Sequence, residues 1–326
     1  MLVSTAPLRI SLAGGGTDLV EYASRHGGIV VGAATDLAVT VVRHRPPAGA
    51  RIRACLDTCD HADDPAAVTN PFARAALLRH WDGEPVHLAS FGDVAPGTGV
   101  GSSAAFCVAL LAALDGHARD PCDLAERASA IETVALRRPV GKQDHYLSAL
   151  GGFQLLHLER DGSAHPEPVA VPPRVRDRLD EELLLFFTGT TRAAGTVRAG
   201  QHEAVRNGDR DVTGRLHDIK SLTGAMLDAL RSGNLTEIGR LLDRHWQLKQ
   251  GLGPAVSTPT IGAAYRDALD AGATGGKLVG AGGGGHLLLH VPVGRRTDVV
   301  TALARHGATR VPALLGGPGV RTTPTP

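Results

Sequence analysis

The sequence predicts an α+β protein with two domains. Its 326 residues are enough for two hydrophobic cores, and a 43% hydrophobic share with 21% charged residues is typical of a globular chain. Predicted strands, hairpins and helices occur in both halves without the regular strand–helix alternation of a doubly wound sheet. Residues 165–173 are rich in proline and are the best candidate for a linker between the domains.

The first half is expected to contain most of the strands. Residues 29–34 and 37–43 are apolar and β-branched, and Thr35-Asp36 between them predicts the turn of a hairpin. Three glycines at 14–16 lead from the first strand into a short helix that ends near residue 26. The other predicted elements are strands at 8–13, 86–91 and 152–158, and helices at 70–81, from 102 onward and at 124–136.

The second half is expected to be mainly helical. Apolar residues recur at helical spacing in residues 216–230 and 235–246, which predicts two helices with core-facing sides. Strands are predicted at 183–187, 277–279 and 286–291, followed by a helix and a last strand that end near residue 315. We therefore expect an N-terminal domain over residues 1–172, a C-terminal domain over 173–315 and a disordered tail over 316–326.

The small net charge limits the classes of partner. At +1, the chain has no general attraction for nucleic acid or for an anionic membrane, so an anion must be bound at a local site. The longest apolar run, residues 104–114, is about half a membrane span. Four scattered cysteines are too few for a disulfide scaffold, which predicts a reducing, cytoplasmic environment. Cys55, Cys59 and His61 have metal-like spacing but no second ligand pair, so zinc is the weaker interpretation there.

The stretch PGTGVGSS at residues 96–103 has the parts of a phosphate site. A helix start leaves backbone N–H groups unpaired and carries about half a positive charge, and glycines let the backbone approach an anion closely. The apolar helix that follows has no acidic residue in its first turn, and we expect its two serines to act as the cap. The residues predicted to hold the phosphates are Pro96, Gly97, Thr98, Gly99, Val100, Gly101, Ser102 and Ser103.

Other glycine and serine motifs are excluded. A Walker A loop needs a lysine between its last glycine and the hydroxyl residue, and here Ser102 follows Gly101 directly. The same serine occupies the last place of a dinucleotide fingerprint, and the closing glycine of a nucleophile elbow is absent. The run at 280–285 fits G-x-G-x-x-G formally, but a predicted strand follows it. It therefore indicates a tight hairpin or a close approach of two backbones.

Two carboxylates follow the phosphate loop. Glu132 lies on the next predicted helix, and Asp144 lies in the sequence GKQD after a glycine break. Phosphoryl transfer uses donors for the phosphates, oxygen ligands for Mg²⁺, a carboxylate near the acceptor hydroxyl and a cation for the moving group. The residues alone also allow simpler roles, because Asp144 could cap a helix that begins near Gln143 and Glu132 could lie on a solvated face.

The chain resembles the GHMP sugar kinases, whose three motifs it contains in order. They are APLRISLAGGGTD at 6–18, PGTGVGSS at 96–103 and KLVGAGGGG at 277–285. The resemblance implies an N-terminal domain of ribosomal protein S5 domain 2-like fold, a ferredoxin-like C-terminal domain, and ATP in the cleft between them. With GKQDHY at 141–146 and TGTTR at 188–192, the motifs most resemble those of kinases that act on D-glycero-D-manno-heptose 7-phosphate.

Some positions depart from the patterns of related kinases. Glycines at 14–16 replace the Gly-Glu-His of galactokinase and mevalonate kinase, which argues against those two substrates. His145 stands where heptose kinases often have glutamine, and Val100 replaces a leucine of the second motif. Fucokinase-like enzymes share related motifs, so a kinase for another sugar is an alternative. Weaker alternatives are a catalytically silent sugar or nucleotide sensor on the same fold and an NAD-dependent oxidoreductase built on residues 280–285.

The resemblance implies roles for individual residues near the reacting groups. Ser103 and Glu132 would hold Mg²⁺. Asp144 would act as base or orienter for the sugar hydroxyl, and Arg9 would lie near the γ-phosphate of ATP. Transfer to the C1 hydroxyl of a heptose 7-phosphate would give the 1,7-bisphosphate.

A second set of residues is expected to bind the acceptor. Asp18 aligns with a carboxylate that grips sugar hydroxyls, although from the residues alone it could instead cap the helix after the glycines. Lys142 and Arg192 are candidates for the acceptor's own phosphate, because both follow turn-forming residues and a guanidinium binds phosphate bidentately. We expect a small-molecule sugar phosphate as the partner and leave a homodimer open. The full predicted set is Gly15, Gly16, Thr17, Asp18, Lys142, Thr191 and Arg192.

Overall fold

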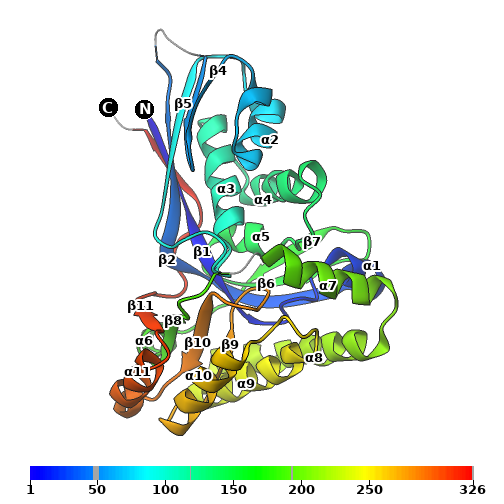
Figure 1. Ribbon diagram of the computed structural model, residues 1–326, viewed down its shortest axis with the longest axis vertical. Coiled ribbons are helices and arrows are strands. Elements are labelled where there is room, and N and C mark those ends of the chain that lie inside the picture. The colour runs from blue at the N-terminus through cyan, green and yellow to red at the C-terminus, as the bar shows by residue number, and fades with distance from the viewer. Residues whose placement is uncertain (47–50, 118, 192–193, 325–326) are drawn as a thin grey trace.

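Two β-sheets organise the chain, which confirms the predicted α+β class. The structure is a computed structural model that describes residues 1–46, 51–117, 119–191 and 194–324, with the backbone alone at 194–199. In Figure 1 the N-terminal sheet and its helices form the upper part of the molecule, and the C-terminal sheet and its helices form the lower part. No helix in the described ranges is long and apolar enough to cross a bilayer.

The upper unit is built on an eight-stranded sheet in the order β12-β1-β2-β5-β3-β4, with β6 paired to β2 and β7 to β6. Helices α2, α3 and α4 lie on one side of it, and α3 is buried along most of its length (Figure 1). The strands are β1 (Leu2–Ala13), β2 (Gly28–His44), β3 (Ile52–Cys55), β4 (Cys59–Ala62), β5 (Val86–Gly92), β6 (Phe153–Leu158), β7 (Ala164–Pro168) and β12 (Arg321–Pro324). The helical segments are α1 (Val20–His26), η1 (Pro65–Ala67), α2 (Pro71–His80), α3 (Ser102–Asp115), α4 (Pro121–Ala130), the π-helix η2 (Ile131–Ala135) and α5 (Gln143–Leu150).

The lower unit has a four-stranded antiparallel sheet in the order β11-β8-β10-β9. Helices α8 and α9 also pack against the upper unit, because their apolar residues belong to the same buried cluster as those of β1 and α3. The strands are β8 (Leu183–Phe187), β9 (Gly275–Leu278), β10 (His286–His290) and β11 (Thr309–Val311). The helices are α6 (Pro173–Glu182), α7 (Ala194–Arg206), α8 (Arg210–Ser232), α9 (Leu235–Gln250), α10 (Pro259–Asp270), η3 (Val293–Arg295) and α11 (Arg296–Ala304).

The hairpin predicted around Thr35-Asp36 is wrong. β2 is one strand of 17 residues that pairs with β1 from Val31 to Arg43, on both sides of the predicted turn. The predicted turn marks a change of partner instead, because residues 28–33 pair with β6 and residues 39–44 with β5. The Thr35 hydroxyl, which is buried, donates to the carbonyls of Leu8 (3.2 Å) and Leu37 (3.1 Å) at this crossover.

Two further expectations about the ends of the domains are corrected. The tail predicted to be disordered contains β12, whose residues pair with Leu2 to Thr5 of β1. The pairing uses backbone groups and a 2.8 Å hydrogen bond between the Ser4 and Thr322 hydroxyls, and Val320 just before the strand packs against the core. The predicted proline-rich linker begins with β7, which pairs with β6 inside the upper sheet.

The cysteines form one local cross-link. Cys55 and Cys59 face each other across the β3–β4 hairpin and are joined by a disulfide. Both thiols are bonded in it, which removes the zinc interpretation for these residues. The cross-link also disagrees with the reducing environment that the scattered cysteines predicted, because two of the four lie close enough to pair across one hairpin. In the described part of the chain, no group of three His, Cys, Asp or Glu side chains is placed to hold a metal ion.

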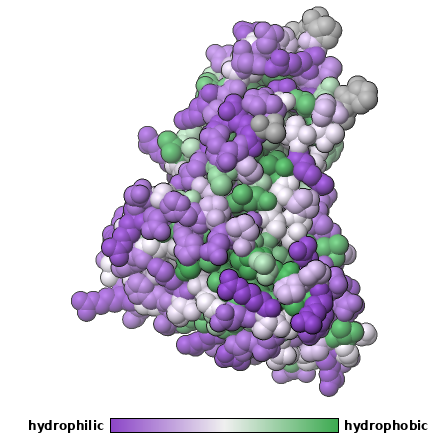
Figure 2. All heavy atoms as spheres, turned by 180° about the vertical axis from the view of Figure 1, so that it is seen from behind, coloured by the Kyte–Doolittle hydropathy of each residue, from purple (hydrophilic) through white to green (hydrophobic). Residues whose placement is uncertain are grey.

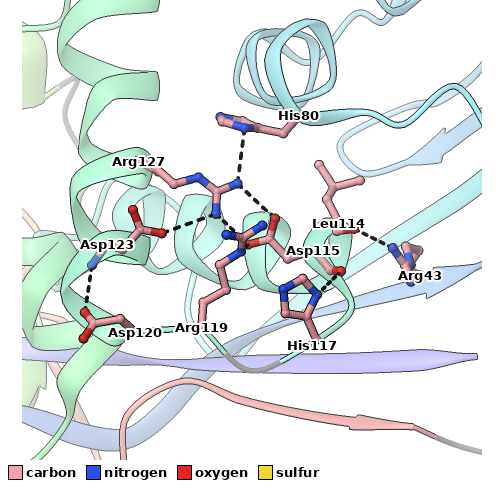
Figure 3. Close-up of polar contacts among 9 residues, drawn as sticks. All are labelled: Arg43, His80, Leu114, Asp115, His117, Arg119, Asp120, Asp123 and Arg127. Atoms are coloured by element: carbon pink, nitrogen blue, oxygen red, sulfur yellow. Dashed lines mark hydrogen bonds and ion pairs between the residues drawn. The ribbon is translucent and has the colours of Figure 1, made fainter.

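A polar cluster fixes the end of α3 (Figure 3). Arg127 on α4 donates two hydrogen bonds to the Asp115 carboxylate (2.6 and 2.9 Å) and contacts Nδ1 of His80 on α2 (3.2 Å). Arg119 forms a 3.0 Å ion pair with the same carboxylate. Burial acts to raise the pKa of Asp115, but Arg127 and Arg119 outweigh it and hold that pKa below its usual value. The cluster anchors α3 at the end opposite its phosphate-loop start.

Most of the surface is hydrophilic. Seen from behind in Figure 2, polar residues cover both units, and apolar side chains gather mainly in a patch at the middle of the molecule.

Candidate active site

The predicted phosphate loop forms a tight glycine turn at the start of α3. Gly97, Gly99 and Gly101 have φ values of +79°, +87° and +80°, which favour glycine. The helix begins at Ser102 after Gly101, and no side chain caps its first N–H groups. The expectation that the serines cap the helix is therefore wrong. The positive end of a buried helix is left to a ligand, because the first turn also has no acidic residue.

The glycine run at 280–285 packs directly against this loop. A Cβ built on Gly99 would lie 2.5 Å from the carbonyl oxygen of Val279, and one on Gly280 would lie 2.5 Å from Cα of Gly99. Nδ1 of His286 contacts the carbonyl oxygen of Thr98 at 2.9 Å. The run lies between β9 and β10 with no helix after it, as the sequence indicated, and it brings the lower unit against the phosphate loop.

Arg9 and Asp144 form a buried ion pair beside the loop. Nε and Nη2 of Arg9 donate to the two Asp144 carboxylate oxygens at 2.6 and 2.7 Å, and Nη1 donates to the Gly99 carbonyl at 2.6 Å. Arg9 is 2% exposed and Asp144 8%. Helix α5 begins after Lys142 without a side-chain cap, so the capping interpretation of Asp144 is wrong. One guanidinium therefore joins the phosphate loop to the carboxylate.

Glu132 is buried rather than solvated. It is 1% exposed, and its carboxylate contacts Nη1 of Arg138 at 2.8 Å and Nε2 of His145 at 3.3 Å. Burial acts to raise the pKa of Glu132, but His145 and Arg138 lower it more, so the pKa lies below its usual value and the group is ionised. Burial and the Glu132 carboxylate raise the pKa of the Cys107 thiol. Cys107 lies one helical turn after Ser103 on α3.

A groove opens in front of the phosphate loop. Its volume is about 550 Å³, and Pro96, Ser102 and Ser103 line it together with the rings of Phe72 and Phe106. The two rings meet edge to face with centroids 6.3 Å apart, and Arg138 lies 5.0 Å over Phe72. The groove thus joins the polar loop to an aromatic wall, which suits a nucleotide with a flat base and a charged tail.

A second pocket lies on the other side of the Arg9–Asp144 pair. It is lined by Gly15, Gly16 and Asp18 from the first motif, which are expected to bind the acceptor, and we call it the acceptor pocket. Oδ1 of Asp18 accepts from the Gly16 N–H (3.1 Å) and from Nε2 of Gln143 (2.8 Å). Helix α1 has no side-chain cap, so the capping interpretation of Asp18 is wrong. The free volume is about 50 Å³, room for only a few waters, so a sugar must displace side chains to enter.

Three residues predicted to bind the acceptor lie elsewhere. Nζ of Lys142 donates to the Glu126 carboxylate (2.7 and 2.8 Å) and to the Gly162 carbonyl (2.7 Å), outside the pocket. Thr17 is fully buried, and its hydroxyl donates to the Gly14 carbonyl, so it holds the glycine turn in shape. Thr191 is exposed and outside the pocket lining, and Arg192 falls outside the described residues.

Sequence reasoning missed several residues that line the acceptor pocket. Ser11 Oγ and Gln143 Oε1 are buried there and have no hydrogen-bond partner among the described residues. Three basic groups come from the lower unit. The sequence did contain an indication of a role for the basic residues. The chain has only four lysines, and one of them, Lys277, lies in a strand without other charged residues. The missed lining residues are Ser11, Gln143, Gln201, His245, Lys249 and Lys277.

Comparisons with known proteins match this architecture. The GHMP kinases N terminal domain model matches residues 68–152, and the GHMP kinases C terminal model matches residues 226–308. The chain is 30% identical to mevalonate kinase of Methanothermobacter thermautotrophicus over 309 residues, 93% of this chain and 94% of that protein. It is 26% identical to D-glycero-alpha-D-manno-heptose 7-phosphate kinase of Campylobacter jejuni over 313 residues, 92% of each chain. A crystal structure of a D-glycero-D-manno-heptose 1-phosphate kinase from Bacteroides thetaiotaomicron has the same fold, with a TM-score of 0.81 and 22% identity over 100% of this chain and 99% of that one.

Proposed function

The chain belongs to the GHMP kinases, and from this membership we propose that it transfers the γ-phosphoryl group of ATP to the C1 hydroxyl of D-glycero-D-manno-heptose 7-phosphate. The product is the 1,7-bisphosphate, and the class is that of an ATP-dependent sugar kinase. One observation carries the proposal. The Arg9 guanidinium binds both the phosphate loop at Gly99 and the Asp144 carboxylate, so a phosphate donor and a hydroxyl acceptor would meet at this pair.

In this proposal, different residues of the chain have different roles in phosphoryl transfer. Backbone N–H groups at the start of α3 bind the phosphates of ATP. The acceptor hydroxyl attacks the γ-phosphorus, the bond to the bridging oxygen of ADP breaks, and the hydroxyl proton passes to Asp144. A carboxylate held by a guanidinium is a weak base, so its main contribution is to orient the hydroxyl in line with the phosphate. Arg9 offsets the negative charge of the moving group.

We propose that Glu132 and Ser103 hold Mg²⁺. An ionised carboxylate and the Ser103 hydroxyl are oxygen donors of the kind this ion prefers, with waters and phosphate oxygens completing its shell. The carboxylate of Glu132 has acceptor capacity beyond its contacts with Arg138 and His145, since two oxygens offer about four lone-pair sites. When bound, the ion would neutralise the charge of the phosphates.

Replacing Glu132 with glutamine should lower kcat/KM at limiting Mg²⁺ by at least about tenfold, with partial recovery as Mg²⁺ is raised. The amide keeps the shape of the side chain but removes its charge. Glu126→Gln is the matched control, because that carboxylate binds Lys142 and Tyr146. Steady-state rates over a Mg²⁺ series test the prediction. An unchanged Mg²⁺ requirement in the Glu132 variant would exclude it as a ligand.

The polar lining of the acceptor pocket supports a sugar. Asp18, Ser11 and Gln143 can accept or donate hydrogen bonds to several hydroxyls. Mevalonate kinase is among the relatives, but the glycines at 14–16 replace the Gly-Glu-His of the mevalonate and galactose enzymes. The heptose 7-phosphate kinase of Campylobacter jejuni supports the choice of acceptor. We also propose that the enzyme works in the cytoplasm on this small molecule, alone or as a homodimer.

An acceptor panel tests the proposed function. Purified protein, ATP and Mg²⁺ are incubated with heptose 7-phosphate, fucose, mannose, galactose or mevalonate, and ADP release is followed. We expect release with heptose 7-phosphate and a product whose new phosphate is at C1 by ³¹P NMR. Faster turnover of fucose would shift the assignment to another sugar. Binding of ATP and sugar by calorimetry without turnover would favour the silent sensor.

A further inference from the structure

Three basic side chains gather on the wall of the acceptor pocket that comes from the lower unit. His245 and Lys249 lie one turn apart on α9, and Lys277 lies on β9. They are 2%, 7% and 2% exposed, and all line the pocket that contains Asp18. The proposed chemistry at Asp144 uses none of them.

In the described structure, no carboxylate lies beside the ammonium group of Lys277. Its Nζ donates to the Leu12 carbonyl at 3.1 Å and lies 3.2 Å from Nδ1 of His245. Lys249 donates to the carbonyls of Leu278 (2.9 Å) and Gly280. The charges that act on Lys277 are those of Lys249 and Arg9, both cations. Basic groups collected in this way form a binding site for an anion.

The pKa values of Lys277 and His245 would respond to an anionic ligand. Burial, followed by the charges of Lys249 and Arg9, holds the pKa of Lys277 well below its usual range. Burial and the two lysines do the same to the pKa of His245. A phosphate among these groups would reverse both effects, because an opposite charge favours the protonated forms.

The position of the cluster favours the acceptor, while Lys249 also reaches the Gly280 carbonyl next to the phosphate loop, so the test includes ATP. Nζ of Lys277 donates to the Leu12 carbonyl, and backbone groups at Leu12 and Gly15, at the glycine turn that leads to Asp18, act to raise the pKa of His245. The phosphate loop instead meets Arg9, through the Gly99 carbonyl. The basic cluster is thus attached to the wall of the predicted sugar site.

We propose that Lys277, Lys249 and His245 bind the phosphate group that the acceptor sugar already has. The proposal rests on the proposed function and adds the residues that would make the enzyme prefer a phosphorylated sugar to a free one. It replaces the prediction for Lys142, whose ammonium group is paired with Glu126. Asp18 and Asp144 then face the hydroxyl end of the same ligand.

The test replaces each lysine with methionine, which has similar length and no charge. For Lys277→Met and Lys249→Met we expect kcat/KM with the sugar 7-phosphate to fall by about 10- to 100-fold, as loss of a charged hydrogen bond predicts. The KM for ATP should stay within about twofold, since the phosphate loop is unchanged. Lys220→Met is the matched control, because Nζ of Lys220 donates to the carbonyls of His26 and Gly27 outside this pocket. Circular dichroism and thermal unfolding confirm that each variant folds.

Calorimetry without nucleotide separates this proposal from the proposed function. Titrating the wild type with the sugar 7-phosphate should show binding that Lys277→Met weakens by about the same factor. Such binding without ADP release would support the basic cluster and overturn the kinase assignment. Turnover with equal kcat/KM for free and phosphorylated sugar would overturn the cluster alone. A rise in the KM for ATP equal to that for the sugar phosphate would assign the cluster to ATP, and a loss seen only in Lys142→Met would return the role to Lys142.

Discussion

Replacing Asp144 with asparagine should lower kcat by about 10²- to 10⁴-fold while the affinity for ATP changes little. The amide keeps one oxygen that can accept from Arg9, but its NH₂ group replaces the second acceptor oxygen, so the variant can neither orient the acceptor hydroxyl in the same way nor take its proton. ATP binding depends on the backbone of the phosphate loop, which this change leaves in place. Single-turnover rates and calorimetry with a non-hydrolysable ATP analogue measure the two quantities separately.

Stability has to be followed in the same variant. Arg9 is 2% exposed, and breaking a buried ion pair by removing one partner costs about 3–5 kcal/mol. Thermal unfolding therefore shows whether lost activity reflects chemistry or folding. Asp161→Asn is the matched control, because that exposed carboxylate bonds only locally to Ser163 in the described contacts. A folded Asp144 variant with a near-normal rate would remove Asp144 from the mechanism.

The second large effect is expected from Gly99→Ala. A methyl group there would lie 2.5 Å from the Val279 carbonyl, and φ at this position is +87°. We expect the loop to shift by a fraction of an ångström or more, which can lower kcat/KM by about 10²-fold. The unfolding free energy should fall by about 1–3 kcal/mol beyond the conformational cost alone.

Gly162→Ala provides the comparison. Its φ is +89°, but a Cβ there would meet nothing within 4 Å. Both variants pay the conformational cost of a left-handed residue, about 1–2 kcal/mol. Only the Gly99 variant also disturbs the contact between the two units. Equal effects on unfolding and on kcat/KM would show that this contact contributes nothing to the site.

Local patterns in the sequence predicted much of the fold. Helical spacing located α8 and α9, and short apolar runs located β8 and β10. The predictions of a hairpin in β2 and of a disordered tail were wrong for the same reason. A turn signal and a tail rich in glycine and proline describe local preference, whereas β-strands are stabilised by partners distant in sequence. No local sequence pattern indicates the π-helix at Ile131–Ala135, in which Glu132 is buried.

The sequence by itself determined the phosphate loop, because glycine geometry and an uncapped apolar helix are properties of consecutive residues. It also supplied Asp144, Glu132 and Asp18 as candidates, and their roles in the reaction remain predictions. Only the tertiary structure decided which side chains meet. Arg9 binds Asp144, which is 135 positions away in the sequence. Lys142 is paired with Glu126, whereas Lys277 lines the acceptor pocket. Charged groups interact over a few ångströms in space, and the number of residues between two groups does not predict their distance in the fold.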